Sequence, residues 1–536
     1  MYQALLTRRY LLRKIIPLLA MLSVALCTAM VIIVVSVMTG FLDMVTQAGR
    51  KLIGDVAIDR QVVGFPYYEE VLAELRGMES VAAASPMIEA YALLKMPFDR
   101  PAHIQVLGIE SESYDAVTGF ASTIYWRPLT SDDLRRRRFP ESDLRREDWK
   151  PQEDTHDLKH RLHEALLSRE YEILGPLGPV GLRNHTAEWQ DPQRPDAPLI
   201  ERLGRAGRTV RTPSGSPGAL IGIRVSIGNE RVASRSYEFQ DTWFMPTREV
   251  TITVLPITDE GGVRQPESRI LPVVNEFVVE RYDVDKAYVF VPLEVLQKML
   301  AMHPVQELSA TERDEFGDPL PTGRLTPGRA TRIVIKAAPG VTPEQLKEQA
   351  AIAYQRVHDR HPSEMPPRSF IEIQTWKEQI ALYIGAVQKE TALVTTLFAI
   401  ISLVSVVLVL SIFWTVVQQK TRDIGILRAV GASRAGITWL FLRYGMILGI
   451  LGVILGAVLA HLIVWNINPI HEFLGEQFGM VIWDPKIYMF DEVPSVVPRT
   501  TALIVMGAGV VFAVLGALIP ALRAAMIDPV SALRYE

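Results

Sequence analysis

Four long runs of residues without charged side chains constrain this fold more than any other feature of the chain. Of the 536 residues, 49% are apolar and 22% are charged, so the two kinds must be segregated along the sequence. An apolar run of about 20 residues crosses roughly 30 Å of hydrocarbon as a helix. We therefore predict an α-helical membrane protein with four transmembrane helices at residues 15–42, 391–419, 437–465 and 500–522.

The first run has two interpretations, a cleaved signal peptide or a membrane anchor. It follows Arg8, Arg9, Arg13 and Lys14, as the core of a secretory signal would. The run is, however, about twice as long as a usual signal core, and no small-x-small cleavage site closes it. We expect it to anchor the chain. Cys27, the only cysteine, lies in this run, so no intrachain disulfide is possible.

The basic residues at the ends of the runs predict the orientation of the chain in the membrane. Four Lys or Arg residues precede the first run, five lie between residues 420 and 443, and Arg523 and Arg534 follow the fourth run. Short cytoplasmic loops are enriched in these residues, so both termini are predicted to be cytoplasmic. The predicted cytoplasmic segments are 1–14, 420–436 and 523–536, and the predicted external segments are 43–390 and the short loop 466–499.

The long external segment has the pattern of a water-soluble α+β domain. Its clearest unit is a strand at 332–336, a turn, and a helix from Thr342 to about residue 358. Thr342 suits the N-cap of that helix, Pro343 its first position, and Gln345 the reciprocal cap. Further strands are predicted at 103–109, 219–227, 250–255, 276–280, 287–291 and 369–374.

The sequence contains no motif for catalysis or metal binding. No GxxxxGK[ST] phosphate loop occurs, so any ATP and Mg²⁺ must be bound by a partner, and GxSxG and HExxH motifs are absent too. His156, His160 and His163 have helical spacing but lie in a segment dense in charges of both signs, where we expect a solvated surface. We predict no catalytic residue, no metal, no bound cofactor and no nucleic-acid partner for this chain.

Four glycines line one face of the third predicted membrane helix. Spacings of four, three and four residues separate them, and this places all four on the same side of a helix. Small residues allow another helix to approach closely, either within the subunit or in a dimer. The glycines are Gly445, Gly449, Gly452 and Gly456.

Several stretches resemble the bacterial ABC-type permeases of the FtsX, MacB and LolC/LolE superfamily. They are VIIVVSVMTGF at 31–41, YVFVPL at 288–293, TWKE at 375–378, and the tail formed by PALRA at 520–524 and DPVSALRYE at 528–536. The first three are similar to the LolC/LolE lipoprotein-releasing branch. The resemblance implies a MacB-like periplasmic α+β domain between the first two membrane helices, and residues 130–269 depart from it as a divergent insert.

By this resemblance, the basic stretch after the second membrane helix is a coupling helix that docks on a partner ATPase. A short amphipathic helix would place Ile424 and Leu427 on one face and leave Arg422 and Arg428 for carboxylates of the partner. Gly425 and Gly431 would allow close approach of the two backbones. The full predicted set is Thr421, Arg422, Asp423, Ile424, Gly425, Ile426, Leu427, Arg428, Ala429, Gly431 and Ala432.

The resemblance implies the membrane subunit of an ABC complex in the bacterial inner membrane. Such a subunit would work with an ATPase and with a second copy of itself or a homologous permease, and would release lipoproteins, with a periplasmic carrier as a further possible partner. Its first helix would contact acyl chains and membrane lipids through Val34, Met38 and Phe41. Two alternatives remain open: MacB-like export of a small molecule or peptide, and FtsX-like regulation of a cell-wall hydrolase without transport.

Overall fold

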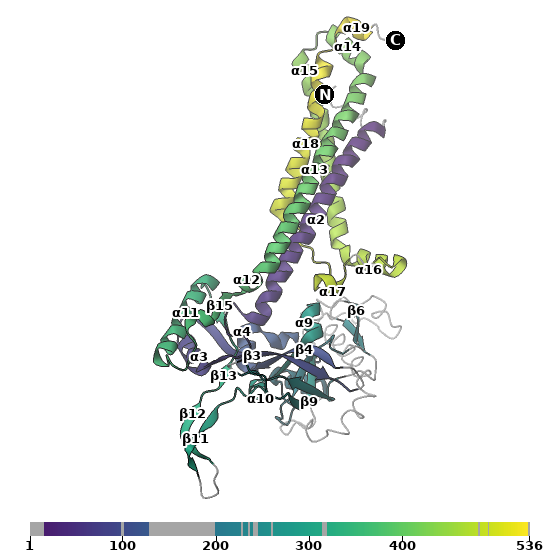
Figure 1. Cartoon of the computed structure of the whole chain (residues 1–536). Coiled ribbons are helices and arrows are strands. Elements are labelled where there is room, and N and C mark those ends of the chain that lie inside the picture. Colours follow the sequence, from purple (N-terminus) through teal and green to yellow (C-terminus); the bar gives the residue numbers. More distant parts are fainter. Residues whose placement is uncertain are drawn as a thin grey trace, which may run out of the picture. The chain divides into compact units, whose positions relative to one another are not determined.

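The computed structural model in Figure 1 describes residues 15–97, 101–127, 199–226, 229–233, 236–239, 245–258, 261–313, 319–480, 483–490 and 492–533. The chain forms two compact units. The membrane unit comprises Met1–Val45, Ala381–Trp483 and Val493–Glu536, and the sheet unit comprises Thr46–Ile380 and Asp484–Glu492. Each unit is described by itself below.

Four long apolar helices form the membrane unit, as predicted (Figure 1). They are α2 (Ile15–Ile53), α13 (Ala381–Gln419), α15 (Arg434–Trp465) and α18 (Arg499–Ala525). Among the described residues, these four helices are the ones long and apolar enough to cross a membrane, over Leu18–Thr46, Ile384–Gln419, Arg434–Trp465 and Arg499–Ala525. All four helices exceed the predicted bounds, α2 and α13 by the most, because the helix continues beyond each apolar run. Thus α2 passes residue 42, and α13 begins before residue 391.

The described part of this unit also contains three short helices: α14 (Thr421–Ala429), α16 (Ile467–Phe478) and α19 (Pro529–Leu533). The predicted short loop at 466–499, which connects α15 to α18, contains the helix α16. Its apolar residues Ile467, Ile470 and Leu474 recur at helical spacing. Gly479 ends α16 in the left-handed region, with φ of +64°.

A nine-stranded mixed sheet is the centre of the sheet unit. Its strand order is β15-β1-β14-β3-β4-β10-β5-β9-β8, and β3 also pairs with β8. Two neighbouring pairs, β4 with β10 and β5 with β9, are parallel, and the others are antiparallel. The bounds are β1 Val56–Asp59, β3 Val81–Lys95, β4 Ala102–Ile109, β5 Ala219–Gly222, β8 Glu249–Val254, β9 Glu267–Phe277, β10 Tyr288–Pro292, β14 Arg332–Ala337 and β15 Glu372–Thr375.

Shorter elements surround this sheet (Figure 1). The two-stranded pairs are β2 (Phe65–Pro66) with β13 (Arg329–Ala330), β6 (Asn229–Ala233) with β7 (Ser236–Phe239), and β11 (Val305–Arg313) with β12 (Pro319–Thr326). The α-helices are α3 (Tyr68–Arg76), α4 (Ser111–Thr118), α8 (Leu199–Thr209), α9 (Tyr282–Ala287), α10 (Leu293–Met299), α11 (Pro343–Arg360), α12 (Trp376–Gln379) and α17 (Pro485–Tyr488), and the 3₁₀ turns are η1 (Phe120–Thr123) and η3 (Arg368–Phe370).

Both faces of the sheet are covered, which confirms an α+β unit. Along β14, Ile333 and Ile335 enter one hydrophobic cluster, which includes side chains from α3, α10 and α11. The residue between them, Val334, enters a second cluster, which includes side chains from α4, α8 and α9. This alternation follows from the two-residue period of a strand.

The predicted strand and helix at 332–358 are present as β14 and α11. The hydroxyl of Thr342 accepts a hydrogen bond from the Gln345 backbone N–H at 3.3 Å, and the Gln345 side chain accepts one from the Thr342 N–H at 3.1 Å. This reciprocal pair is the predicted capping box.

Three predicted strands are shorter in the structure. The strand at 219–227 ends at Gly222, where a Cβ atom would lie 2.2 Å from the Asp285 carbonyl oxygen. The strand at 276–280 is only the end of β9, because the carboxylate of Asp285 accepts from the N–H groups of Val279 and Glu280 and turns the chain away. The strand at 369–374 begins with the 3₁₀ turn η3, and β15 starts at Glu372.

The predicted divergent insert at 130–269 is only partly described. Residues 130–198, with His156, His160 and His163, lie outside the described residues. The described remainder supplies α8, β5, β6, β7 and β8, and the first part of β9. Part of this predicted insert therefore belongs to the central sheet.

A segment from the predicted loop 466–499 belongs to the sheet unit. The Tyr282 N–H donates to the Met489 carbonyl oxygen at 2.7 Å, and Arg281 forms an isolated β-bridge with Phe490. Residues 484–492, which include α17, thus pack on α9 within this unit.

A buried carboxylate, Glu276, joins separate segments of the sheet unit. Its side chain is fully buried at the end of β9. The Trp126 indole Nε1 donates to Oε2 at 2.8 Å, and the Asn229 amide donates to Oε1 at 2.9 Å. Next to it, the Asn275 side chain donates to the carbonyls of Trp126 and Leu203, both at 2.8 Å. Burial raises the pKa of Glu276 to about 7, although both hydrogen bonds act to lower it.

We predict that this contact weakens as the pH rises. The folded state holds the Glu276 proton to about pH 7, whereas the unfolded state loses it near the ordinary pKa of 4.5. The free energy of local opening therefore falls between these pH values, by on the order of 3 kcal/mol at most, and is flat above them. Hydrogen exchange of the Tyr125 and Trp126 amides, corrected for intrinsic rates, measures this. Glu276→Gln should abolish the pH dependence, and an unchanged dependence in this variant would contradict the assignment.

Candidate functional site

A short helix, α14, lies between α13 and α15 at the position of the predicted coupling helix. The chain bends at Lys420, whose backbone leaves the helical range before α14 begins. The Lys420 ammonium lies 2.8 Å from the Asp423 carboxylate, and the Thr421 hydroxyl donates to the Gln418 carbonyl oxygen at 2.9 Å. These local contacts tie the start of α14 to the end of α13.

A glycine turn ends α14. The Ala432 N–H donates to the Leu427 carbonyl oxygen at 3.0 Å, and the Gly431 N–H donates to that of Arg428 at 3.1 Å. This is a Schellman motif, and Gly431 occupies its left-handed position with φ of +103°. No atom lies within 4 Å of a Cβ built on Gly431. The turn itself therefore requires this glycine, and Ser433 then caps α15 by accepting from the Gly436 N–H at 3.1 Å.

One side of α14 is buried in its own subunit, which corrects the predicted role of Ile424. Only 2% of the Ile424 surface is exposed, and the neighbouring Gly425 is buried too. Ile424 packs in a cluster at the ends of α13, α15 and α18 that are predicted to be cytoplasmic. The other members of this cluster are Val417, Ile437, Phe441, Ala521, Ala524 and Ala525. The sequence predicts that Ile424 and Leu427 share one face of the helix. In the structure Ile424 is buried and Leu427 is exposed, so this prediction is wrong.

The outward side of α14 is mixed in chemistry. Ile426 and Leu427 are 46% and 41% exposed. Arg422, Asp423 and Ala429 are exposed as well. An apolar pair beside an exposed arginine is a surface that suits a partner protein with an apolar groove and carboxylates.

The two predicted partner-binding arginines differ in their surroundings. Arg422 is exposed, whereas Arg428 is half-buried and its Nη1 donates to the Ala432 carbonyl oxygen at 3.5 Å. The Arg428 Nε is buried and has no hydrogen-bond partner among the described residues. Arg428 therefore stabilises the turn after α14, whereas Arg422, which is exposed, is the better candidate for a contact with a partner.

The smallness of Gly425 also has a cause within the chain. A Cβ on Gly425 would lie 2.7 Å from the Ala532 Cβ in α19. Carbon atoms in contact are normally about 3.5 to 4.0 Å apart. The structure therefore explains Gly425 by the packing of α19, which differs from the predicted close approach of a partner.

The glycine stripe of α15 packs within the subunit, against two different helices. Cβ atoms on Gly445 and Gly449 would each lie 2.7 Å from an alanine Cβ of α18. Cβ atoms on Gly452 and Gly456 would lie 2.9 and 2.4 Å from the backbone oxygens of Met21 and Ala25 in α2. Of the two open interpretations, the structure thus supplies an intrasubunit role for all four glycines.

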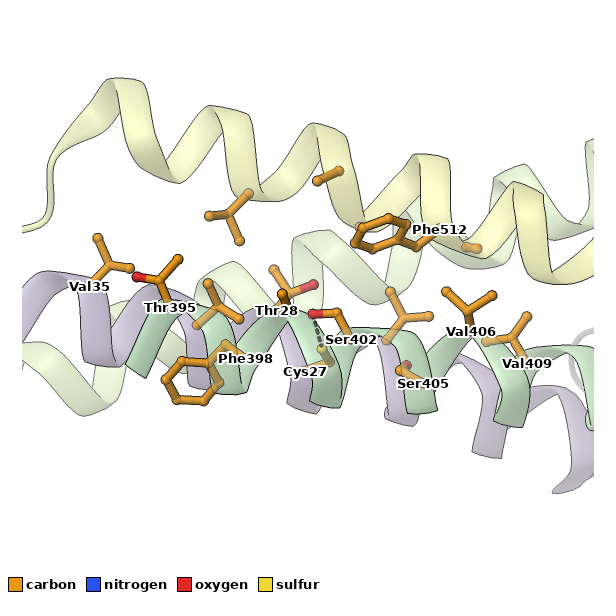
Figure 2. Close-up of a pocket in the computed structure, with 17 residues that line it drawn as sticks. Cys27, Thr28, Val35, Thr395, Phe398, Ser402, Ser405, Val406, Val409 and Phe512 are labelled. Atoms are coloured by element: carbon orange, nitrogen blue, oxygen red, sulfur yellow. Dashed lines mark hydrogen bonds between the residues drawn. The ribbon is translucent and has the colours of Figure 1, made fainter. Parts of the chain in front are cut away.

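A largely apolar cavity of about 210 Å³ lies between α2, α13 and α18. Figure 2 shows side chains from these three helices around it, among them Val35 of α2, Phe398 and Val406 of α13, and Phe512 of α18. Two weak polar contacts cross from α2 to α13 at its edge. Sγ of Cys27 lies 3.3 Å from Oγ of Ser402, and the hydroxyls of Ser23 and Ser405 are 3.1 Å apart.

The predicted acyl-chain contacts lie elsewhere on α2. Val34, Met38 and Phe41 are all partly exposed, but none of them lines this cavity. The Phe41 ring meets the Trp483 ring edge-on, with centroids 5.7 Å apart. Val31 and Val35, on neighbouring positions of the same helix, line the cavity instead. All of these α2 residues are apolar, so the sequence alone could not show which of them line the cavity.

Among the described residues, four helices are thus long and apolar enough to cross a membrane. The family model FtsX-like permease C-terminal matches residues 395–529, a range that includes α14, α15 and α18 and most of α13. The membrane unit therefore carries an FtsX-like permease domain, and the resemblance to the FtsX, MacB and LolC/LolE superfamily is confirmed.

Curated relatives match parts of the chain. The lipoprotein-releasing system transmembrane protein LolC of Neisseria meningitidis serogroup B is 27% identical over 169 residues, which cover 32% of this chain and 41% of the relative. The macrolide export ATP-binding/permease protein MacB 2 of Aeromonas hydrophila is 29% identical over 210 residues, which cover 38% of this chain and 28% of the relative. The chain thus spans about two fifths or less of the length of these relatives.

Among solved structures, the periplasmic region of MacB from Actinobacillus actinomycetemcomitans aligns with 63% of this chain and 95% of that one. The sequence identity is 8% and the TM-score is 0.26, which is too low to bear on the fold.

We predict that Gly456→Ala destabilises the membrane unit, because the new methyl would meet the Ala25 carbonyl oxygen of α2. Overpacking of this kind costs about 1 to 3 kcal/mol. The single cysteine lies in α2 beside α13, so a thiol-reactive dye that labels Cys27 during heating in detergent reports separation of these helices.

Gly507→Ala in α18 is the matched control, since no atom lies within 4 Å of a Cβ at that position. It should leave the unfolding temperature unchanged or slightly raised. If Gly456→Ala instead changed the oligomeric mass at an unchanged unfolding temperature, the glycine stripe would be a dimer contact.

Proposed function

We propose that this chain is the membrane subunit of an ABC transporter, and that a separate ATPase docks on the outward side of α14. The observation that carries this proposal is the pairing of exposed Ile426 and Leu427 with exposed Arg422 on a short helix held between two membrane helices. The match of this region to an FtsX-like permease domain supports it. In this proposal α14 and both termini are cytoplasmic, and the sheet unit is periplasmic.

The chain itself contributes no catalysis in this proposal. Its sequence contains no phosphate loop, so ATP and Mg²⁺ would bind to the partner ATPase. Hydrolysis in the partner would displace α14, and α13 would move with it because local contacts at Lys420 join the two helices. The energy would thus reach the sheet unit mechanically.

The proposed work is release of lipoproteins from the inner membrane. The similarity to LolC supports this substrate, and so does the apolar cavity between α2, α13 and α18, whose lining suits an acyl chain. The active complex would contain two permease subunits, either two copies of this chain or one copy with a homologous permease.

The similarity to MacB 2 favours a second candidate, export of a small molecule or peptide. Depletion of the protein followed by membrane fractionation separates the two. Retention of lipoproteins in the inner membrane is expected for release. Normal lipoprotein sorting with raised drug sensitivity would favour export, and normal sorting with altered septation would favour regulation of a cell-wall hydrolase.

We predict that Arg422→Glu abolishes binding of the ATPase. A like charge placed opposite carboxylates of the partner costs several kcal/mol, so copurification should fail, and the ATPase activity stimulated by the permease should fall at least about tenfold. Copurification and ATP hydrolysis in detergent or nanodiscs measure both effects.

Arg434→Glu is the control for this substitution. Arg434 is also exposed and lies in the same predicted cytoplasmic segment, but it belongs to the first turn of α15. It should leave stimulation intact. Equal losses in both variants would indicate a general effect of charge on insertion, and full stimulation in Arg422→Glu would refute docking on α14.

A further inference from the structure

The C-terminal helix α19 packs on the buried side of α14. Gly425 of α14 is buried, and Ala532 of α19 is 2% exposed. A Cβ on Gly425 would lie 2.7 Å from the Ala532 Cβ and 3.7 Å from two of its backbone atoms. No side chain separates the two helices at this point, so they are in close contact and leave no space for an additional atom. Figure 1 shows α14 and α19 side by side.

The tail that carries α19 is fixed to the end of α18. After α18 ends at Ala525, Ile527 packs against the same cluster that buries Ile424. The Ala532 N–H then donates to the Asp528 carbonyl oxygen at 2.9 Å within the turn of α19. Only a short connection therefore separates the helix that touches Gly425 from the fourth membrane helix.

A further contact joins α18 to α13 at the same end of the bundle. The Arg523 guanidinium carbon lies 4.1 Å from the centroid of the Trp414 ring. A cation over an aromatic face at this distance is attractive. The base of α14 is thus enclosed by α13 on one side and by α18 with its tail on the other.

We propose that α19 is a strap that positions α14 relative to α18, and that Ala532 is its positioning residue. The proposal rests on the proposed function, in which α14 receives the motion of the ATPase. A displacement of α14 then passes to α18 through the contact of Ala532 with Gly425, as well as to α13 through the chain at Lys420. The C-terminal tail is part of the transmission and does not itself bind the ATPase.

Exchange of one methyl group across this contact tests the strap. Gly425→Ala adds a methyl where Ala532 already lies, and Ala532→Gly removes the opposing one. We expect Gly425→Ala to reduce the permease-stimulated ATPase activity by about tenfold, the effect of an overpacking cost near 1.4 kcal/mol. The double variant should recover stimulation to within about twofold of the wild type, because the total volume is restored.

The double variant distinguishes the strap from a contact with the ATPase. If Gly425 were small to admit the ATPase, Ala532→Gly would not rescue Gly425→Ala, and that outcome overturns the proposal. Gly425→Ala could also lower the yield of folded protein. In that case, recovery of the yield in the double variant supports the contact between Gly425 and Ala532, and a yield that stays low overturns the proposal. Thermal unfolding followed through Cys27 monitors folding of each variant.

Val530→Ala is the matched control in the tail, since Val530 is 72% exposed. Full stimulation is expected, and a loss would overturn the proposal by making α19 a docking surface in its own right. Failure of the proposed function has a different signature, because no ATPase would then be bound or stimulated by the wild-type chain.

Discussion

The absence of water in the hydrocarbon is the constraint on which the membrane unit depends. Most backbone N–H and C=O groups of α2, α13, α15 and α18 must therefore be satisfied within their own helix, apart from the bond that Pro520 removes from α18. Such helices need close contacts to move together, and α15 supplies them with glycines. Gly445 and Gly449 admit α18, whereas Gly452 and Gly456 admit α2. One helix face thereby joins the first and fourth helices of the bundle.

The same physics decided how much the sequence could predict. Apolar length located the four membrane helices, and the capping residues Thr342 and Gln345 located α11, because both signals are local. Ile424 and Leu427 are equally apolar, and only tertiary packing assigns one inward and the other outward. Gly425 and Gly431 also look alike in the sequence. Gly431 is required by the positive φ of a local turn, whereas Gly425 is required because Ala532, far along the chain, packs against it.

The sheet unit was harder to predict for the same reason. Its strands pair across long separations, as β1 does with β14 and β15. The strand ends at Gly222 and Phe277 are set by Asp285, whose backbone crowds the first and whose carboxylate turns the chain after the second. Residues 484–492 join this unit although membrane helices flank them in sequence. The chain therefore passes between the two units four times, which gives helix movements several covalent routes into the sheet unit.

In the proposed function, motion of α14 would act on helices that form the cavity in the membrane unit. Two of its walls, α13 and α18, are joined to α14 by Lys420 and by the tail, whereas the third wall, α2, packs on α15 at Gly452 and Gly456. Motion of α14 would therefore act on α13 and α18 more directly than on α2. Among the described residues, two weak polar contacts, Cys27 with Ser402 and Ser23 with Ser405, join α2 to α13 beside the cavity. Such contacts contribute about 1 kcal/mol each, so in the proposed function a step driven by the partner ATPase would separate these walls and change the space for an acyl chain.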